Sequence, residues 1–231
     1  MTSLKINWQQ IEDSLNEEGY AQLSSILSPQ QCAASIAGYE KEEAYRKRIV
    51  MQRHGYGQGE YRYFNYPLPE LVTGLRRGIY AGLAPIANRW AETLGNEALY
   101  PDQLEDYTKI CHDAGQTKPT PLILKYGPGD YNRLHQDLYG DHSFPLQMAI
   151  LLSEPGQDFD GGEFILTEQR ARMQSRATVV PLKKGDAVIF AVNDRPFQGI
   201  KRMSRAKMRH GVSKLLRGDR FTLGIIFHDA A

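Results

Sequence analysis

The chain has 231 residues, of which 41% are hydrophobic and 24% are charged, as is typical of a globular protein. Its length fits one domain, and its mean hydropathy of −0.49 argues against both disorder and a membrane protein. No apolar run reaches the ~18 residues of a membrane-spanning helix, and the N-terminus lacks the features of a signal peptide. We therefore expect a cytoplasmic protein that does not associate with membranes.

The net charge of +1 hides an uneven distribution along the chain. Residues 167–217 contain 13 basic and 3 acidic residues, a local net charge of +10. Such a segment favours an anionic partner, although a solvated basic surface explains it equally well. Cys32 and Cys111 have no neighbouring cysteine. We expect both to be reduced thiols rather than parts of a disulfide or a thiolate metal site.

Apolar residues recur at helical spacing in the first half of the chain. The predicted helices are one ending at Gly19, one from a cap at Ser28 to about Arg48, Glu70–Leu94, and one from Pro101 to about Ala114. We interpret residues 1–118 as a mainly helical support that could also cover the substrate.

The pattern changes to short apolar runs in residues 119–231, separated by Gly, Pro and Asp. The predicted strands are Leu122–Tyr126, Gln147–Leu152, Glu163–Leu166, Ala177–Val180, Ala187–Val192, Arg209–Val212 and Phe221–Phe227. Many short strands without intervening helices are typical of an antiparallel sandwich or barrel. The sequence thus predicts one α+β domain, in which helices pack against a β-core.

His135 and Asp137 are the first candidate metal ligands. At this spacing in a strand the imidazole and the carboxylate point to the same face and can bind one ion, although a solvent-facing strand end explains the pair equally well. A third ligand must come from elsewhere. His210 begins a predicted strand, whereas His142 is very close to Asp137, and His228, near the end of the chain, is expected to close the last strand. Two imidazoles and one carboxylate leave positions open for substrate and oxygen, as in non-haem Fe(II) oxygenases.

Arg220 and Thr222 are also predicted to share a strand face. A buried guanidinium beside a hydroxyl is suited to binding a carboxylate through paired hydrogen bonds. Tyr126, nine residues before His135, could donate its phenol to the same group. A surface ion pair for Arg220 and a core position for Tyr126 are the structural alternatives.

These residues lie in a chain that resembles the Fe(II)- and 2-oxoglutarate-dependent dioxygenases. The resemblance covers about Pro121–Asp229, and its blocks are Lys125–Asp137, Asp160–Phe164, Lys184–Phe190, His210–Val212 and Arg220–Leu223. It implies a double-stranded β-helix, or jelly-roll, core and hydroxylation of a substrate C–H bond. The implied cofactor is Fe(II), and the implied cosubstrates are 2-oxoglutarate and O2.

The resemblance also implies a role for each candidate residue. His135, Asp137 and His210 would bind the iron. Arg220, with Tyr126 and Thr222, would bind the far carboxylate of 2-oxoglutarate.

Within this superfamily the chain resembles a bacterial branch that oxidises nucleic acid and is related to the AlkB-type dealkylating enzymes. The features that carry this likeness are residues 53–64 and 223–229. Two positions depart from the AlkB pattern, because Ile226 replaces a second arginine and Leu124 replaces an asparagine. The spacing from His210 to Arg220 resembles that of prolyl hydroxylases at least as closely.

The implied function is oxidative demethylation, dealkylation or modification of nucleic-acid bases, with single-stranded or damaged nucleic acid as the partner and DNA repair as one role. The first alternative is a prolyl-hydroxylase-like enzyme that acts on a peptide, an amino acid or a small metabolite. A more remote alternative is a non-catalytic β-barrel binding module.

Two segments provide candidate substrate contacts. The first is basic and leads into His210, so we expect Arg202 and Arg205 to contact phosphates at the rim of the site. The second segment interleaves aromatic residues with arginines, and its candidates for base stacking and backbone binding are Arg53, Tyr56, Tyr61 and Arg62. The alternative for the second segment is that its aromatic residues pack the helices onto the β-domain.

Overall fold

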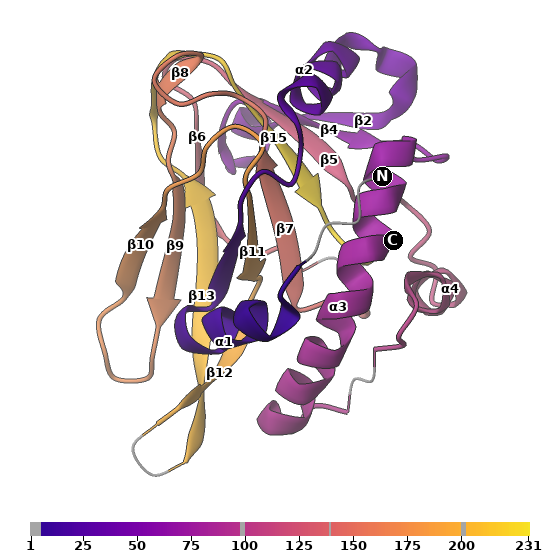
Figure 1. Cartoon of the computed structure of the whole chain (residues 1–231), viewed down its shortest axis with the longest axis vertical. Coiled ribbons are helices and arrows are strands. Elements are labelled where there is room, and N and C mark those ends of the chain that lie inside the picture. The colour runs from indigo at the N-terminus through magenta and orange to yellow at the C-terminus, as the bar shows by residue number, and fades with distance from the viewer. Residues whose placement is uncertain (1–5, 98–99, 139, 200–201) are drawn as a thin grey trace.

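The computed structural model describes residues 6–97, 100–138, 140–199 and 202–231, and it consists of two facing antiparallel sheets with helices along one side (Figure 1). The major sheet has the strand order β1-β11-β7-β15-β5-β4-β2. The minor sheet has the order β10-β9-β13-β6-β3, with β12 also paired to β13, and a small third sheet joins β14 to β8. From β5 onward the chain crosses repeatedly between the two large sheets, which is the jelly-roll arrangement that the sequence predicts.

The bounds of the elements are as follows. The helices are α1 (Trp8–Glu18), α2 (Pro29–Ala37), α3 (Glu70–Leu94) and α4 (Leu104–Asp113), with 3-10 turns at Gly38–Glu40, Glu42–Ala44 and Met51–His54. The major-sheet strands are β1 (Tyr20–Leu23), β2 (Tyr45–Val50), β4 (Glu60–Phe64), β5 (Leu122–Tyr126), β7 (Leu146–Leu151), β11 (Ala187–Ala191) and β15 (Arg220–Ile225). The other strands are β3 (Gly57–Gln58), β6 (Tyr131–His135), β8 (Phe159–Gly161), β9 (Phe164–Gln169), β10 (Arg176–Val180), β12 (Asp194–Gln198), β13 (Met203–Val212) and β14 (Leu215–Gly218).

The second helix is shorter than its predicted extent. Ser28 and Gln31 form the expected capping box, and Pro29 occupies the first turn. The helix ends at Ala37, however, rather than near Arg48. Residues 45–50 instead form β2, because their aromatic and β-branched side chains pair with β4 at the edge of the major sheet.

The N-terminal half contributes to the β-core as well as supporting it. β1 pairs with β11 at one side of the major sheet, and β4 pairs with β5 at the other. β3 extends the minor sheet beside β6. The prediction of a mainly helical segment at 1–118 therefore missed four strands, because runs of two to six residues are too short to show a clear period.

One face of the major sheet points toward the minor sheet and supplies the floor of the site. Directly paired residues share a face, and the register pairs Arg220 with Tyr126, Thr222 with Leu124, and Phe190 with Gln147. The alternate residues, such as Met148 and Leu223, point to the opposite face, and they belong to one hydrophobic core cluster with residues of α1 and α3. No helix within the described ranges is long and apolar enough to span a membrane.

A buried ion pair fixes the end of the last strand to α3. The Arg76 guanidinium donates to the Asp229 carboxylate at 2.7 Å, and both side chains are almost fully buried. Tyr66 donates to the same carboxylate at 2.7 Å, and Nε2 of His112 lies 2.8 Å from it. This network makes the His228-Asp229 end a structural closure, as expected from the sequence.

Replacing Asp229 by asparagine is expected to lower the free energy of unfolding at neutral pH by about 3–5 kcal/mol, because it leaves the buried Arg76 charge without its partner. Burial raises the pKa of Asp229, but Arg76 and the hydrogen bonds of the network outweigh it and hold the pKa below its usual value. The contribution is therefore present above the unfolded-state pKa of about 4 and is lost as the pH falls through the lower folded-state pKa.

Denaturant unfolding of Asp229→Asn and the parent between pH 3 and pH 8 checks this expectation. The matched control is Asp113→Asn, which removes a carboxylate from the exposed pair with Lys109. The control is expected to change the free energy by less than about 0.5 kcal/mol. Equal effects of the two substitutions would contradict the assigned role of Asp229.

Candidate iron and cosubstrate site

His135, Asp137 and His210 converge at one point between the two sheets. Their ligand atoms all lie within 4.8 Å of one another. The Asp137 carboxylate lies between the imidazoles, 3.4 Å from Nε2 of His135 and 3.3 Å from Nε2 of His210. The two histidines are register partners on β6 and β13, so the pairing of these strands brings the distant residues together.

The surroundings of both histidines favour metal binding through Nε2. Nδ1 of His135 lies 2.7 Å from the backbone carbonyl of Arg133, so it donates there and leaves the Nε2 lone pair free. The His210 ring packs against Phe190 at a centroid distance of 4.6 Å and against Phe164 at 6.1 Å. These contacts orient the imidazole within an apolar wall.

The charges of the three groups suit a divalent cation. Burial raises the pKa of Asp137, but its interactions with His135 and His210 outweigh burial and hold the pKa well below its usual value. Burial and the neighbouring His135 lower the pKa of His210. Burial lowers the pKa of His135, but Asp137 and the Arg133 carbonyl outweigh burial and raise it. The Asp137 carboxylate and the His210 imidazole thus favour the protonation states that a metal ion requires, and His135 gives up its proton when the ion binds.

The donor set fits Fe(II). Two imidazole nitrogens and one carboxylate oxygen meet on one side of the site, and a cavity lies on the other. Such a set holds non-haem iron while leaving coordination positions for cosubstrate and oxygen. A closed structural site would instead surround the ion with protein ligands.

Arg220 is placed to bind an anionic cosubstrate beside the metal ligands. Its side chain is 2% exposed, and one of its nitrogens donates to the Thr222 hydroxyl at 2.6 Å. The guanidinium carbon lies 5.6 Å from the centre of the Tyr126 ring. Burial lowers the pKa of Arg220 to about 10, so the group remains a cation at neutral pH.

Two buried polar atoms, one on Arg220 and one on Tyr126, show that this end of the cavity suits a carboxylate. Nε of Arg220 has no hydrogen-bond partner among the described residues, and the Tyr126 hydroxyl is left without one, although the Asn132 side chain approaches it. Glu163 influences the pKa of Arg220, but no ion pair joins the two in the described part of the chain. A bound carboxylate would pair with the guanidinium and the phenol, and the far carboxylate of 2-oxoglutarate fits this requirement.

A cavity of about 1180 Å³ connects the metal ligands with Arg220 and opens to the surface. Its walls come from both sheets, from the segment before β3 and from the loop after β6. Several of the residues around its mouth are aromatic or apolar and exposed, namely Tyr56, Leu134 and Leu138.

The four substrate candidates in the aromatic segment occupy different places. Tyr61 and Tyr56 line the cavity, Tyr61 on the floor and Tyr56 at the mouth, whereas Arg53 is exposed outside it. Arg62 points to the other face of β4, where it is buried, stacks on Tyr39 and donates to the Tyr39 carbonyl at 2.7 Å. Alternation along the strand thus excludes Arg62 from the site, and the packing alternative holds for it.

The expectation that Arg202 and Arg205 lie at the rim of the site is wrong. At ~3.3 Å per residue, Arg205 begins about 17 Å from His210 along β13 and Arg202 about 26 Å from it. Arg205 forms an ion pair with Asp194 and donates to the carbonyl of Leu94 at the far end of the molecule, where the β12–β13 hairpin lies (Figure 1).

The remaining cations of this basic segment also miss the cavity. Lys207 and Arg209 are exposed on the outer face of β13, because they alternate with the inward-facing Met208 and His210. Arg195 is buried in an ion pair with Glu168. Lys201 lies outside the described residues.

Sequence reasoning missed the cations that do line the cavity. They are Arg46, Lys47, Lys118 and Arg133. They are scattered over 88 positions of the sequence, so no local charge cluster reveals them. Arg133 alone had a usable signal, because it stands two residues before His135 and so belongs to the same strand as the metal ligand.

The fold and the site together define an Fe(II)- and 2-oxoglutarate-dependent dioxygenase. Residues 59–230 match the Oxygenase-NA family, described as an oxygenase catalysing oxidative methylation of damaged DNA. The chain belongs to this family. Both parts of the resemblance seen in the sequence, to the dioxygenase superfamily and to its nucleic-acid branch, are thereby confirmed.

Relatives with similar sequences are found in Mycobacterium tuberculosis. Two proteins described as uncharacterized, MT2286 and Rv2227, are each 48% identical to the chain over 168 residues. The match covers 73% of this chain and 72% of each relative.

Solved structures with the same fold include a Pseudomonas putida prolyl-4-hydroxylase, with a TM-score of 0.53 and 16% identity over 97% of this chain and 99% of that one. A 2OG-Fe(II) oxygenase from Burkholderia pseudomallei has a TM-score of 0.55 and 15% identity, covering 98% of this chain and 94% of that one. These likenesses confirm the jelly-roll fold.

Proposed function

We propose that this dioxygenase oxidises alkylated bases in single-stranded or damaged nucleic acid. The observation that carries the proposal is the charge around the cavity. Arg46, Lys47, Lys118 and Arg133 line it, and none of them forms an ion pair with a side chain in the described part of the protein. The only acidic side chain among the described lining residues is the metal ligand Asp137.

Such a cavity favours a polyanion whose reactive part is uncharged and apolar. Lysine and arginine side chains supply most of the affinity for a phosphate backbone. The exposed Tyr56 stacks on His54 at the mouth, with ring centroids 5.3 Å apart and an interplanar angle of 21°. A flat aromatic pair beside cations is a suitable platform for an unstacked base.

The chemistry follows from the residues that surround the site. Bound Fe(II), with O2 and 2-oxoglutarate, supplies the oxidising power for hydroxylation of a C–H bond. Arg220 and Tyr126 hold the cosubstrate at one end, and the apolar wall around Phe190 excludes water from the other. Hydroxylation of an N-methyl group yields a hemiaminal, which releases formaldehyde and leaves the unmodified base.

The direct test is incubation of the Fe(II)-loaded protein with 2-oxoglutarate and methylated single-stranded DNA, methylated RNA or a peptide pool. Succinate and product masses are measured for each. Loss of a methyl group from an oligonucleotide supports the proposal, whereas oxidation confined to peptides would make the protein a peptide hydroxylase.

Binding of a methylated single-stranded oligonucleotide is expected to depend on salt through the cavity cations. Replacing Lys47 and Arg133 by glutamine should reduce the slope of log affinity against log salt by about 0.7 for each phosphate that is no longer neutralised. Fluorescence anisotropy between 50 and 300 mM salt measures the slope. The matched control is the Arg202→Gln, Arg205→Gln pair, which removes the same charge far from the cavity. A slope that falls only in this control pair would place the nucleic acid elsewhere.

A further inference from the structure

Gln147 is a buried polar side chain in the wall of the cavity that the dioxygenase chemistry above does not use. It is the polar residue in the strand β7, whose other members are Leu, Met, Ala and Ile. Its exposure is 4%, and its Nε2 has no hydrogen-bond partner among the described residues. A buried amide donor without an acceptor is costly, so its retention in a cavity wall points to a partner that arrives with the ligand.

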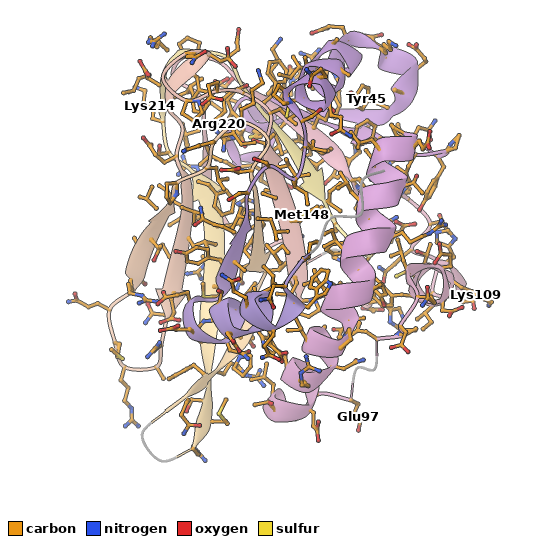
Figure 2. All side chains as sticks on the ribbon, viewed as in Figure 1. Tyr45, Glu97, Lys109, Met148, Lys214 and Arg220 are labelled. Atoms are coloured by element: carbon orange, nitrogen blue, oxygen red, sulfur yellow. The ribbon has the colours of Figure 1, made fainter. Side chains whose placement is uncertain are left out.

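The register places Gln147 at the opposite end of the cavity from the cosubstrate anchor. Thr222 pairs with Leu151 of β7, and Gln147 lies four residues further along, about 13 Å away. Figure 2 agrees, because it labels Arg220 near one end of the barrel and Met148, the neighbour of Gln147, well away from it.

Gln147 also lies next to the metal centre. Its register partner on β11 is Phe190, and the Phe190 ring packs on the ligand His210 at 4.6 Å. The amide is thus beside the metal site, yet far from the carboxylate that Arg220 would bind. Its position suits contact with a substrate group near the metal ligands rather than with the carboxylate bound by Arg220.

We propose that Gln147 selects the substrate by hydrogen bonding to the base that is oxidised. This inference rests on the proposed function. The Nε2 donor requires an acceptor on the base, and the same amide carries an acceptor for an amino group. A glutamine amide is complementary to N7 and N6 of adenine, which lie side by side.

Gln147 therefore favours alkylated adenine over alkylated cytosine. Methylation of adenine at N1 leaves N7 and N6 available to the amide. Methylation of cytosine at N3 blocks the ring nitrogen beside its amino group, so the paired hydrogen bonds cannot form. A site built to form such hydrogen bonds discriminates strongly against a base that lacks them.

The test compares single-stranded oligonucleotides carrying N1-methyladenine or its 7-deaza analogue, in which a C–H replaces N7. For the parent protein, kcat/KM is expected to be about 10-fold lower with the analogue. Gln147→Leu should lower kcat/KM about 10-fold with the natural base and show no further loss with the analogue. Gln22→Leu, on the exposed edge strand β1, is the matched control and should behave like the parent.

Equal rates of the parent on the two oligonucleotides would overturn the inference without any variant, so the result does not depend on whether Gln147→Leu folds. An increased KM for 2-oxoglutarate in Gln147→Leu would assign the amide to the cosubstrate and also overturn it. If the parent oxidises neither oligonucleotide but hydroxylates a peptide, the proposed function itself is wrong.

Discussion

Replacing Asp137 by alanine is expected to abolish succinate formation from 2-oxoglutarate. The carboxylate is the one anionic ligand of the site and lies between the two imidazoles. Its loss leaves only two imidazoles for a dication, and removal of supporting groups alone already lowers metal affinity by about 10–100-fold. The measurement is iron content after Fe(II) loading and desalting, together with succinate released per enzyme.

The matched control for this substitution is Asp141→Ala. Asp141 is an exposed aspartate four positions along the same loop, and it does not line the cavity. The control should retain both iron and turnover. Retained turnover in Asp137→Ala, or in His135→Ala, would show that the metal is held elsewhere.

Replacing Arg220 by leucine is expected to raise the KM for 2-oxoglutarate by about 100-fold, with a smaller effect on iron binding. A charge-assisted hydrogen bond to a buried carboxylate contributes about 1.5–3 kcal/mol, and two parallel bonds account for the larger value. Arg220→Lys should recover only part of the affinity, because an ammonium cannot form the paired contact. Affinity for 2-oxoglutarate in the Fe(II)-loaded protein, measured by titration calorimetry without substrate, provides a readout that does not depend on turnover.

Arg217→Leu is the matched control for this second substitution. Arg217 lies three residues earlier in the chain, but it is exposed and pairs with Asp160 on the surface. Its replacement should leave the affinity for 2-oxoglutarate unchanged. Because burial lowers the pKa of Arg220 only to about 10, that affinity should not vary between pH 6 and pH 8.5 through this group. Unchanged affinity in Arg220→Leu would contradict the assignment of the anchor.

The pairs His135–Asp137 and Arg220–Thr222 were predictable from the sequence because short-range geometry places the members of each pair together. A spacing of two in a strand places His135 and Asp137 on one face, and the same rule joins Arg220 to Thr222. The pairing of His210 with His135 was a long-range fact that a single sequence does not encode locally. The family resemblance supplied it, and the strand register explains it.

The residues that line the cavity for substrate were only partly predictable, because successive side chains of a strand point to opposite faces of the sheet. The basic run before His210 is adjacent in sequence, but Lys207 and Arg209 point outward while His210 points inward. Cations from three separate segments, around residues 46–47, 118 and 133, meet at the cavity instead. The basic segment in the sequence therefore predicted that cations surround the site but not which cations they are.

Gln147 is marked in the sequence as a polar residue within an apolar run, an observation that the predictions from sequence did not use. A single amide within an otherwise apolar strand breaks the hydrophobic pattern. Such an interruption indicates either a buried polar contact or a ligand-binding position. Only the three-dimensional structure shows which, because it reveals that the nitrogen faces a cavity without a partner among the described residues.

Residues 119–231 contribute four neighbouring strands, β11, β7, β15 and β5, to the major sheet. The N-terminal strands β1 and β4 pair with the two outer ones, β11 and β5. A shortened chain beginning at residue 119 would leave β11 and β5 with rows of free amide and carbonyl groups. Exposed rows of this kind recruit strands from other molecules and lead to aggregation. The β-strands of residues 119–231 therefore depend on the N-terminal half to cover both edges of their sheet.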